Sequence, residues 1–287
     1  IAENGLKLYN DYLTPEKTYE YFYNMLNSLS KIRKQPVIKQ NDMNLNIIVA
    51  YRNSIDDERR KQLLIFKSQM SLIFKEKTNL NIFVIEQEED RDDYDSLPDI
   101  FKQEDTKMAK FNLGVLKNIG FSLSDEYGRK NGYEDNKTYY ILSDVDLLPS
   151  YNLIDDYLKF PEKPIHLGNL GTRYNENGND PNFLGGVISF KDEDFIQCNG
   201  YPNNFWGWGG EDNVLLDRLK QNNIDIERSE YPVIDLENLS IDKKQELLWK
   251  NKLKMNKDIK NAKRKEDKTN NNWQNNGLLQ INDTYEI

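Results

Sequence analysis

An alternation of short apolar runs and amphipathic stretches in the first half of the chain limits the fold more than any other sequence feature. The apolar runs are rich in β-forming residues, and the stretches between them repeat apolar side chains at helical spacing. We therefore expect strands at 45–51, 80–85 and 138–142, and helices at 56–75 and 106–121. Strand, helix, strand, helix, strand is the order of a parallel sheet with right-handed crossovers. The sequence thus predicts an α/β domain.

The second half predicts a mixed arrangement. Strands are expected near 164–167 and 186–190, followed by a helix that starts in a glycine-rich loop. Before the sheet, residues 15–33 predict a separate helix that ends ahead of Pro36. The pattern weakens after Ile241, and the Asn-rich run 270–276 is of low complexity and expected to be mobile.

Charge is unevenly distributed along the chain. The formal net charge of −9 over 287 residues argues against nucleic acid as the main partner. Between Lys243 and Lys268, however, eleven Lys and Arg stand against four Asp and Glu. A solvated helix or tail is the simplest explanation, and a surface for anionic lipid or nucleotide phosphates is the alternative. Cys198 is the only cysteine, so no intrachain disulfide can form, which favours a reducing compartment.

Two aspartates follow the third predicted strand directly. Asp144-Val145-Asp146 would lie at the carboxyl end of a parallel strand, where open sheets bind their ligands. Paired carboxylates suit a hard divalent cation, and a nucleotide diphosphate can complete its shell. So short a pattern also occurs by chance, but its placement after a buried strand favours a ligand site.

A second motif, Trp206-Gly207-Trp208-Gly209-Gly210-Glu211-Asp212, interleaves tryptophan with glycine. Glycine supplies no packing area and costs backbone entropy, so this segment is poor core material. It suits a mobile loop that lays an aromatic face against a sugar ring. Glu211 and Asp212 then begin an apolar helix, where the helix dipole favours anions. The simpler alternative is that both acids serve only as helix-start charges.

Together these motifs resemble the β-1,4-galactosyltransferase family, inverting enzymes with the GT-A fold. The likeness covers about residues 45–240 and is carried, in order, by Ala50–Asn53, Phe111-Asn112, Ser143–Pro149 and Phe183–Asp212 with its Gly185-Gly186 pair. It implies a Rossmann-like mixed sheet flanked by helices. The expected domains are an N-terminal helical segment (1–43), a GT-A domain (44–242, its nucleotide-binding half about 44–149 and its acceptor half about 150–242) and a basic, partly mobile C-terminal extension (243–287).

The resemblance also implies roles for particular residues. Contacts to the donor are expected from Tyr51, Arg52, Asn112, Asp144, Val145, Asp146, Arg173, Phe183 and Gly186. Contacts to the acceptor are expected from Trp208, Gly209, Glu211 and Asp212. Asp212, assisted by Glu211, is the expected catalytic base, which removes a proton from the acceptor hydroxyl. Trp208 is the loop tryptophan expected to close over the donor, and Arg173 stands where the family has a lysine near the diphosphate.

The metal site departs from the family pattern. Family members place a histidine ligand after the acidic loop, but the single histidine here is His166, upstream of that loop, which we expect to be structural. Either Glu237 or Asp235 replaces it, giving an all-oxygen site for Mn²⁺ or Mg²⁺ with Asp146 and Asp144, or metal binding is weak.

The expected reaction is transfer of a hexose from a UDP-sugar to a saccharide acceptor, lipid- or protein-linked. Phe183 stands where a bulky family residue is associated with galactose. Alternatives are an N-acetylgalactosaminyl- or glucuronosyltransferase of polysaccharide synthesis, and a catalytically lapsed module that binds glycans or partners. Missing family disulfides and an Asn/Lys/Ile-rich composition predict a cytoplasmic bacterial or viral enzyme, with peripheral membrane contact through the basic segment as an option.

Overall fold

The computed structural model describes residues 42–54, 57–88, 94–97, 102–103, 108–172, 174–178, 180–237, 239–250 and 253–281, all of which belong to one compact unit. The helix predicted at 15–33 and the donor contact Arg173 lie outside these residues. The boundaries at 43 and 242 therefore remain predictions.

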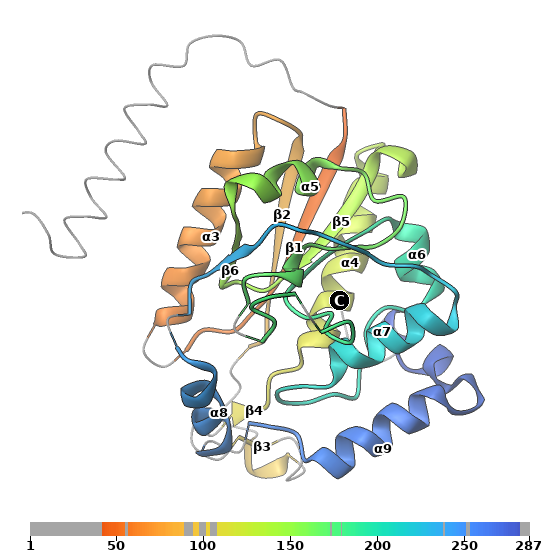
Figure 1. Cartoon of the computed structure of the whole chain (residues 1–287). Coiled ribbons are helices and arrows are strands. Elements are labelled where there is room, and N and C mark those ends of the chain that lie inside the picture. Colours follow the sequence, from red (N-terminus) through yellow and green to blue (C-terminus); the bar gives the residue numbers. More distant parts are fainter. Residues whose placement is uncertain are drawn as a thin grey trace, which may run out of the picture. The chain divides into compact units, whose positions relative to one another are not determined.

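A six-stranded mixed sheet forms the centre of the fold (Figure 1). Its strands are, in spatial order, β2 (Asn79–Glu86), β1 (Asn44–Tyr51), β5 (Thr138–Ser143), β8 (Val187–Phe190), β7 (Ile165–His166) and β9 (Glu227–Arg228). The β2, β1 and β5 strands are parallel, β8 is antiparallel to both β5 and β7, and β9 is parallel to β7. The predicted class, a mixed α/β sheet flanked by helices, is confirmed.

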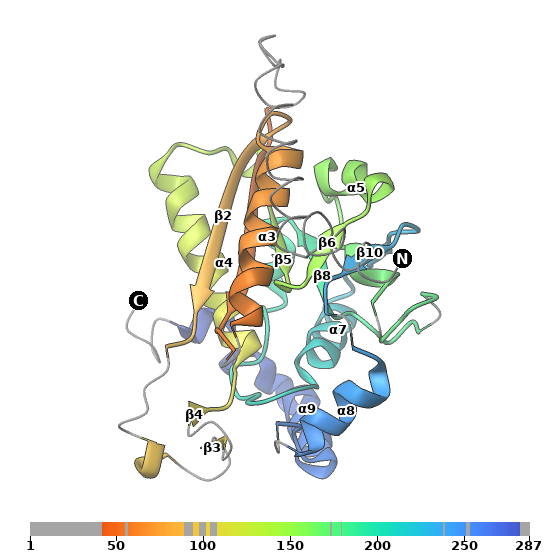
Figure 2. The same cartoon turned by 90° about the vertical axis from the view of Figure 1, so that its left-hand side faces the viewer.

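Two long helices cover opposite faces of the parallel strands (Figure 2). Helix α3 (Glu58–Phe74) buries Phe66, Met70 and Phe74 in one core cluster, as its apolar spacing predicts. Helix α4 (Leu113–Lys130) buries Phe121 in the other. It lies very close to the sheet, because a Cβ atom built on Gly120 would come 2.3 Å from Ile48 Cγ2.

The predicted start of the second helix at 106 is wrong. Residues Met108–Ala109 form β4, which pairs with β3 (Lys102–Gln103). The helix begins only at Leu113, because the side chain of Asn112 accepts a hydrogen bond from Val115 N at 3.1 Å and so caps the first turn.

Shorter elements connect the sheet to the C-terminal helices. They are β6 (Leu147–Pro149), α5 (Ile154–Leu158), α6 (Asp192–Gln197), α7 (Glu211–Gln221), β10 (Val233–Asp235), α8 (Ile241–Lys250), α9 (Lys257–Lys268), and the 3₁₀ turns η2 (Tyr94–Ser96), η4 (Asp135–Lys137), η5 (Tyr151–Leu153), η6 (Leu167–Asn169), η7 (Thr269–Asn275) and η8 (Leu278–Gln280). Antiparallel pairing of β6 with β10 matters most for function, because it sets Asp235 opposite Leu147, next to the Asp-Val-Asp turn. No described helix combines the length and the apolar character that a membrane span requires.

The basic C-terminal segment packs on α7 through a buried ion pair. Arg218 of α7 is fully buried and binds Asp267 of α9 with both prongs, Nε–Oδ2 at 3.0 Å and Nη2–Oδ1 at 2.6 Å. The same guanidinium donates to the carbonyl oxygens of Asn199, Gly200 and Asn276. The Asn-rich run, expected to be mobile, forms η7 and the turn after it, and so contributes to this contact.

Replacing Asp267 tests how far the domain depends on this segment. Asp267→Asn leaves a buried guanidinium without its counter-charge, so we expect the free energy of unfolding to fall by about 3 kcal/mol. Urea denaturation followed by circular dichroism measures the change. The exposed neighbour provides the control, since Glu266→Gln should unfold like the unmodified protein. Equal midpoints for the two variants would contradict a structural role for the pair.

Candidate functional site

A buried lysine joins the two acidic motifs. The side chain of Lys117, on α4, is 1% exposed, and its Nζ lies 3.1 Å from Asp144 Oδ1. Burial lowers the pKa of Lys117, but the carboxyl groups of Asp144, Asp212 and Glu211 outweigh it, and the net pKa is raised. The carboxyl groups therefore stabilise the charged form of Lys117, and these four residues are called the Lys117 cluster below.

Local structure explains why the cluster forms. Asp144 follows β5 directly, and its backbone N donates to Gly186 O at 3.0 Å, which ties the turn to the start of β8. Glu211 and Asp212 open α7 after Gly210, whose φ of 112° is left-handed and favours glycine. Gly185 leaves room for the side chain of Asp212, because a Cβ atom there would lie 2.9 Å from Asp212 Oδ2.

The acids of the cluster hold protons more tightly than ordinary carboxyl groups. Burial is the main cause of the raised pKa of Asp144 and of Glu211. The pKa of Asp212 lies well above its usual range because of burial and, next, the charge of Glu211. Because the groups interact, they titrate as a set rather than one at a time.

Three buried oxygen atoms in the Lys117 cluster or next to it have no hydrogen-bond partner in the described structure. They are Glu211 Oε2, Asp212 Oδ1 and the hydroxyl of Tyr201. This hydroxyl lies next to the Asp212 carboxyl without hydrogen-bond geometry, and the Tyr201 ring centroid is 5.4 Å from Lys117 Nζ. Unsatisfied buried polar groups are costly, so such atoms are retained where a ligand completes them.

Asp146 pairs with a different cation, the guanidinium of Arg59. Arg59 of α3 lies 3.0 Å from Asp146 Oδ2 and 3.7 Å from Glu237 Oε1. Glu237 also pairs with Lys244 at 2.6 Å, while Asp235 Oδ1 accepts the backbone N–H of Glu237. Of the two candidates for the missing ligand, Glu237 thus has its carboxylate turned to the same positive centre as Asp146.

These residues fit a divalent ion shared with a substrate, but not a closed protein cage. Within the described residues no set of three or more His, Cys, Asp or Glu side chains is arranged to hold a metal. Asp146 and Glu237 converge on a guanidinium, so the surroundings favour positive charge there. Mg²⁺ and similar ions are commonly held by one or two carboxylates plus phosphate oxygens.

The tryptophan loop is tied to the segment after α8. Trp208 N donates to Leu253 O at 2.8 Å, and Met255 N donates to Trp208 O at 3.3 Å. The Trp208 ring centroid lies 5.6 Å from that of Tyr174. Gly209 has a φ of 98°, and a Cβ atom built on it would have no atom within 4 Å. The space beside the backbone next to the indole is therefore open.

The residues predicted to contact the nucleotide already make contacts with other residues of the protein. Arg52 Nη2 donates to Gln103 Oε1 at 3.1 Å, and its guanidinium lies 5.4 Å from the Phe111 ring centroid. Asn112 caps α4 and donates to Asn203 O at 2.8 Å. Tyr51 ends β1 as a buried residue whose pKa is raised, chiefly by burial. Their donor roles remain predictions.

The remaining donor residues border the cluster. Val145 is buried between the two aspartates. Gly186, with a φ of 89°, leaves room for Leu147, whose Cδ1 would lie 2.7 Å from a Cβ atom there. Phe183 lies against the His166 ring, with centroids 5.5 Å apart.

His166 is structural, as predicted. It is fully buried, its Nε2 bonds to Gly185 O at 2.9 Å, and its Nδ1 accepts from Arg228 at 2.8 Å. Arg228 also donates to the carbonyl oxygens of Phe183 and Pro181. Burial lowers the pKa of His166 to about 4. This neutral ring therefore supports the backbone beside Asp212.

Sequence reasoning missed Lys117, Arg59 and Tyr201. Only Lys117 carried a usable signal. It lies on the α4 stripe that includes Gly114, Phe121 and Ser124, all of them buried, and a lysine on a buried stripe requires a negative partner.

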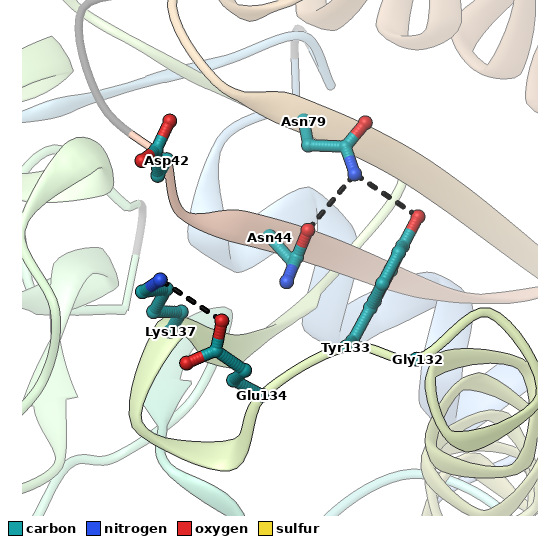
Figure 3. Close-up of a pocket in the computed structure, with 7 residues that line it drawn as sticks. All are labelled: Asp42, Asn44, Asn79, Gly132, Tyr133, Glu134 and Lys137. Carbon is teal, nitrogen blue, oxygen red and sulfur yellow. Dashed lines mark hydrogen bonds and ion pairs between the residues drawn. The ribbon is translucent and has the colours of Figure 1, made fainter.

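A separate pocket lies at the opposite edge of the parallel strands (Figure 3). Asn44 and Asn79 begin β1 and β2, and Asn79 Nδ2 donates to Asn44 Oδ1 at 2.8 Å and to the Tyr133 hydroxyl at 3.1 Å. Lys137 at its rim pairs with Glu134 at 2.9 Å. None of the predicted site residues lines it.

Comparison with known proteins finds similarity to galactosyltransferases. A family model described as the N-terminal domain of galactosyltransferase matches residues 166–240. Human β-1,4-galactosyltransferase 4 is 29% identical over 187 residues, covering 63% of this chain and 44% of the relative. Drosophila β-1,4-galactosyltransferase 7 is 32% identical over 133 residues, covering 45% and 37%. The chain thus spans less than half the length of these relatives.

Among solved structures, that of a mutant Drosophila β-1,4-galactosyltransferase 7 in complex with manganese, UDP-Gal and xylobiose aligns with a TM-score of 0.49 and 25% identity, over 68% of each chain. The fold and site define a mixed α/β domain with an acidic site at the carboxyl edge of its parallel strands. Over the matched residues, the chain is similar to proteins of the β-1,4-galactosyltransferase family.

The prediction of a cytoplasmic bacterial or viral enzyme is wrong. The relatives found include proteins from human, mouse, cattle and Drosophila. Residue composition and a single cysteine describe the chemistry of the chain, and neither identifies the organism or the compartment.

The protonation of His166 can be measured without ambiguity, because the chain has one histidine. We expect its ring to titrate with a pKa of about 4, against about 6.5 for a free histidine. Nitrogen-15 NMR of the tag-free protein reports this directly. Because the folded pKa is depressed, stability should decrease as pH falls from 6.5 towards 4. A ring that titrates near 6.5 would show that the buried network does not form.

Proposed function

We propose that the protein is an inverting glycosyltransferase that moves a hexose, galactose by our interpretation, from a UDP-sugar to a saccharide hydroxyl. The Lys117 cluster is the observation that carries the proposal, since it brings the acidic turn and the acidic loop to one place. The relatives are named β-1,4-galactosyltransferases, and Phe183 occupies the position associated with donor choice.

Asp212 is suited to act as the base. Burial and the neighbouring Glu211 raise its pKa towards the range in which a carboxylate accepts protons efficiently. The acceptor hydroxyl gives its proton to Asp212 as its oxygen forms a bond to the anomeric carbon. The bond from that carbon to the diphosphate breaks in the same step, the leaving oxygen takes the electron pair, and the configuration inverts.

The other residues hold the reactants. Glu211 offers an unpartnered buried oxygen to an acceptor hydroxyl, and Trp208 offers an indole face to its ring. Burial raises the pKa of Asp144, and the charge of Lys117 at 3.1 Å offsets part of that rise beside the donor sugar. Asp146 and Glu237 would hold Mn²⁺ or Mg²⁺ after displacing Arg59, with Asp144 and Asp235 as the further candidates. When bound, such an ion neutralises charge on the departing diphosphate.

Exchanging the base tests the reaction. Asp212→Asn keeps the shape but cannot accept a proton, so we expect kcat to fall by at least about a hundredfold, with the fold intact. Release of UDP in the presence of UDP-galactose and an acceptor measures turnover. Asp225→Asn, an exposed change just beyond α7, is the control.

Near-normal turnover in Asp212→Asn would remove the proposed base. UDP binding by calorimetry without transfer to any acceptor would instead identify a lapsed module that binds glycans or partners. Turnover with another UDP-sugar alone would identify one of the polysaccharide-building alternatives.

The charge of Lys117 should set the pH dependence of catalysis. Its charge lowers the pKa of Asp212, whereas Glu211 and Asp144 raise it and the Tyr201 hydroxyl lies alongside. Lys117→Met should therefore move the acid limb of the kcat/KM profile to higher pH, by about one unit. Lys220→Met, at an exposed position of α7, should leave that limb in place. An unshifted limb in a folded Lys117→Met protein would contradict the electrostatic coupling.

A further inference from the structure

A second tryptophan lies close to Trp208 and has no part in the proposed mechanism. Trp249, near the end of α8, is 71% exposed. The amino group of Lys254 lies 5.4 Å from the ring centroid of Trp208 and 6.0 Å from that of Trp249. One cation is therefore shared by two indoles, close enough together for one short saccharide to contact both.

The backbone fixes this arrangement. Leu253 N donates to Leu248 O at 3.0 Å, which holds the segment to α8. The same residue accepts from Trp208 N, and Lys254 forms a parallel bridge with Trp208. Helix α8, residues 253–255 and the tryptophan loop are thus one hydrogen-bonded surface, which meets the Lys117 cluster at Glu211.

This surface carries positive charge that can bind an anionic ligand. No carboxylate of the described residues lies within ion-pair distance of Lys254, so water or a ligand must satisfy it. Lys260 of α9 lies against Gly210, with its Cδ 2.8 Å from a built Cβ, and lowers the pKa of Glu211. These lysines belong to the segment with eleven basic and four acidic residues, in a chain whose net charge is −9.

We propose that Trp208, Lys254 and Trp249 form an extended acceptor subsite for a saccharide chain that carries acidic groups. The indoles bind the apolar faces of successive sugar rings, and Lys254 between them binds a carboxylate, sulfate or phosphate. The inference rests on the proposed function, because it names the class of acceptor. It differs from a membrane-binding patch, in which charge lies along a helix face rather than between two aromatic rings.

The test measures binding rather than turnover, and so is separate from the test of catalysis. Calorimetry compares a hyaluronan tetrasaccharide, which carries carboxylates, with a neutral N-acetylglucosamine tetramer. We expect the acidic ligand to bind more tightly than the neutral one, and its binding to weaken as the salt concentration increases. Lys254→Met should lower the affinity for the acidic ligand about fivefold and leave the affinity for the neutral ligand unchanged. Trp249→Ala should lower the affinity for both tetrasaccharides by about tenfold.

Two controls match these changes. Lys265→Met removes an exposed charge from the same basic segment, and Tyr151→Ala removes an aromatic ring that is 88% exposed elsewhere. Both should bind like the unmodified protein. Equal affinity for the two tetrasaccharides, or equal effects of Lys254→Met and Lys265→Met, would overturn the proposal. Displacement of hyaluronan by UDP would assign Lys254 to the nucleotide, and binding only to phosphatidylserine vesicles would assign it to a membrane.

Discussion

The ionic contact between Lys117 and the acids around it is the interaction on which the site depends. A lysine buried on the sheet-facing side of α4 cannot remain charged without carboxylates, and these come from the turn after β5 and from the start of α7. Two segments nearly seventy residues apart are thereby drawn together. Burial raises the pKa values of Asp144 and Asp212, and the same charge partly offsets both rises.

A second cation organises the other side of the Asp-Val-Asp turn. Arg59 bridges Asp146 and Glu237, which arrive from β5 and from beyond β10. Under the proposed function, Glu237 is the carboxylate that replaces the histidine of the family pattern. Neutral His166 serves elsewhere, holding the carbonyl of Gly185 beneath the Asp212 carboxylate. The histidine thus supports the backbone beside Asp212.

The C-terminal segment takes part in both the fold and the proposed acceptor face. Arg218 and Asp267 join α7 to α9 through a fully buried pair, and residues 253–255 extend the tryptophan loop by backbone hydrogen bonds. Two of the basic residues that a linear reading assigns to a solvated tail, Lys254 and Lys260, therefore lie beside Trp208 and Gly210.

Periodicity and residue type determined the three parallel strands of the sheet, because 44–51, 79–86 and 138–143 carry short apolar runs rich in β-forming residues. Short motifs likewise marked Asp144, Asp146, Glu211 and Asp212. The late start of α4 could not be predicted, since the β3–β4 pairing and the Asn112 cap depend on contacts across the chain. Only tertiary structure decided which cations face which acids. Arg59 and Lys254 read as ordinary surface charges in sequence, and the stripe of Lys117 indicates a negative partner without naming it. The effect of all three depends on burial and distance, which a linear pattern does not record.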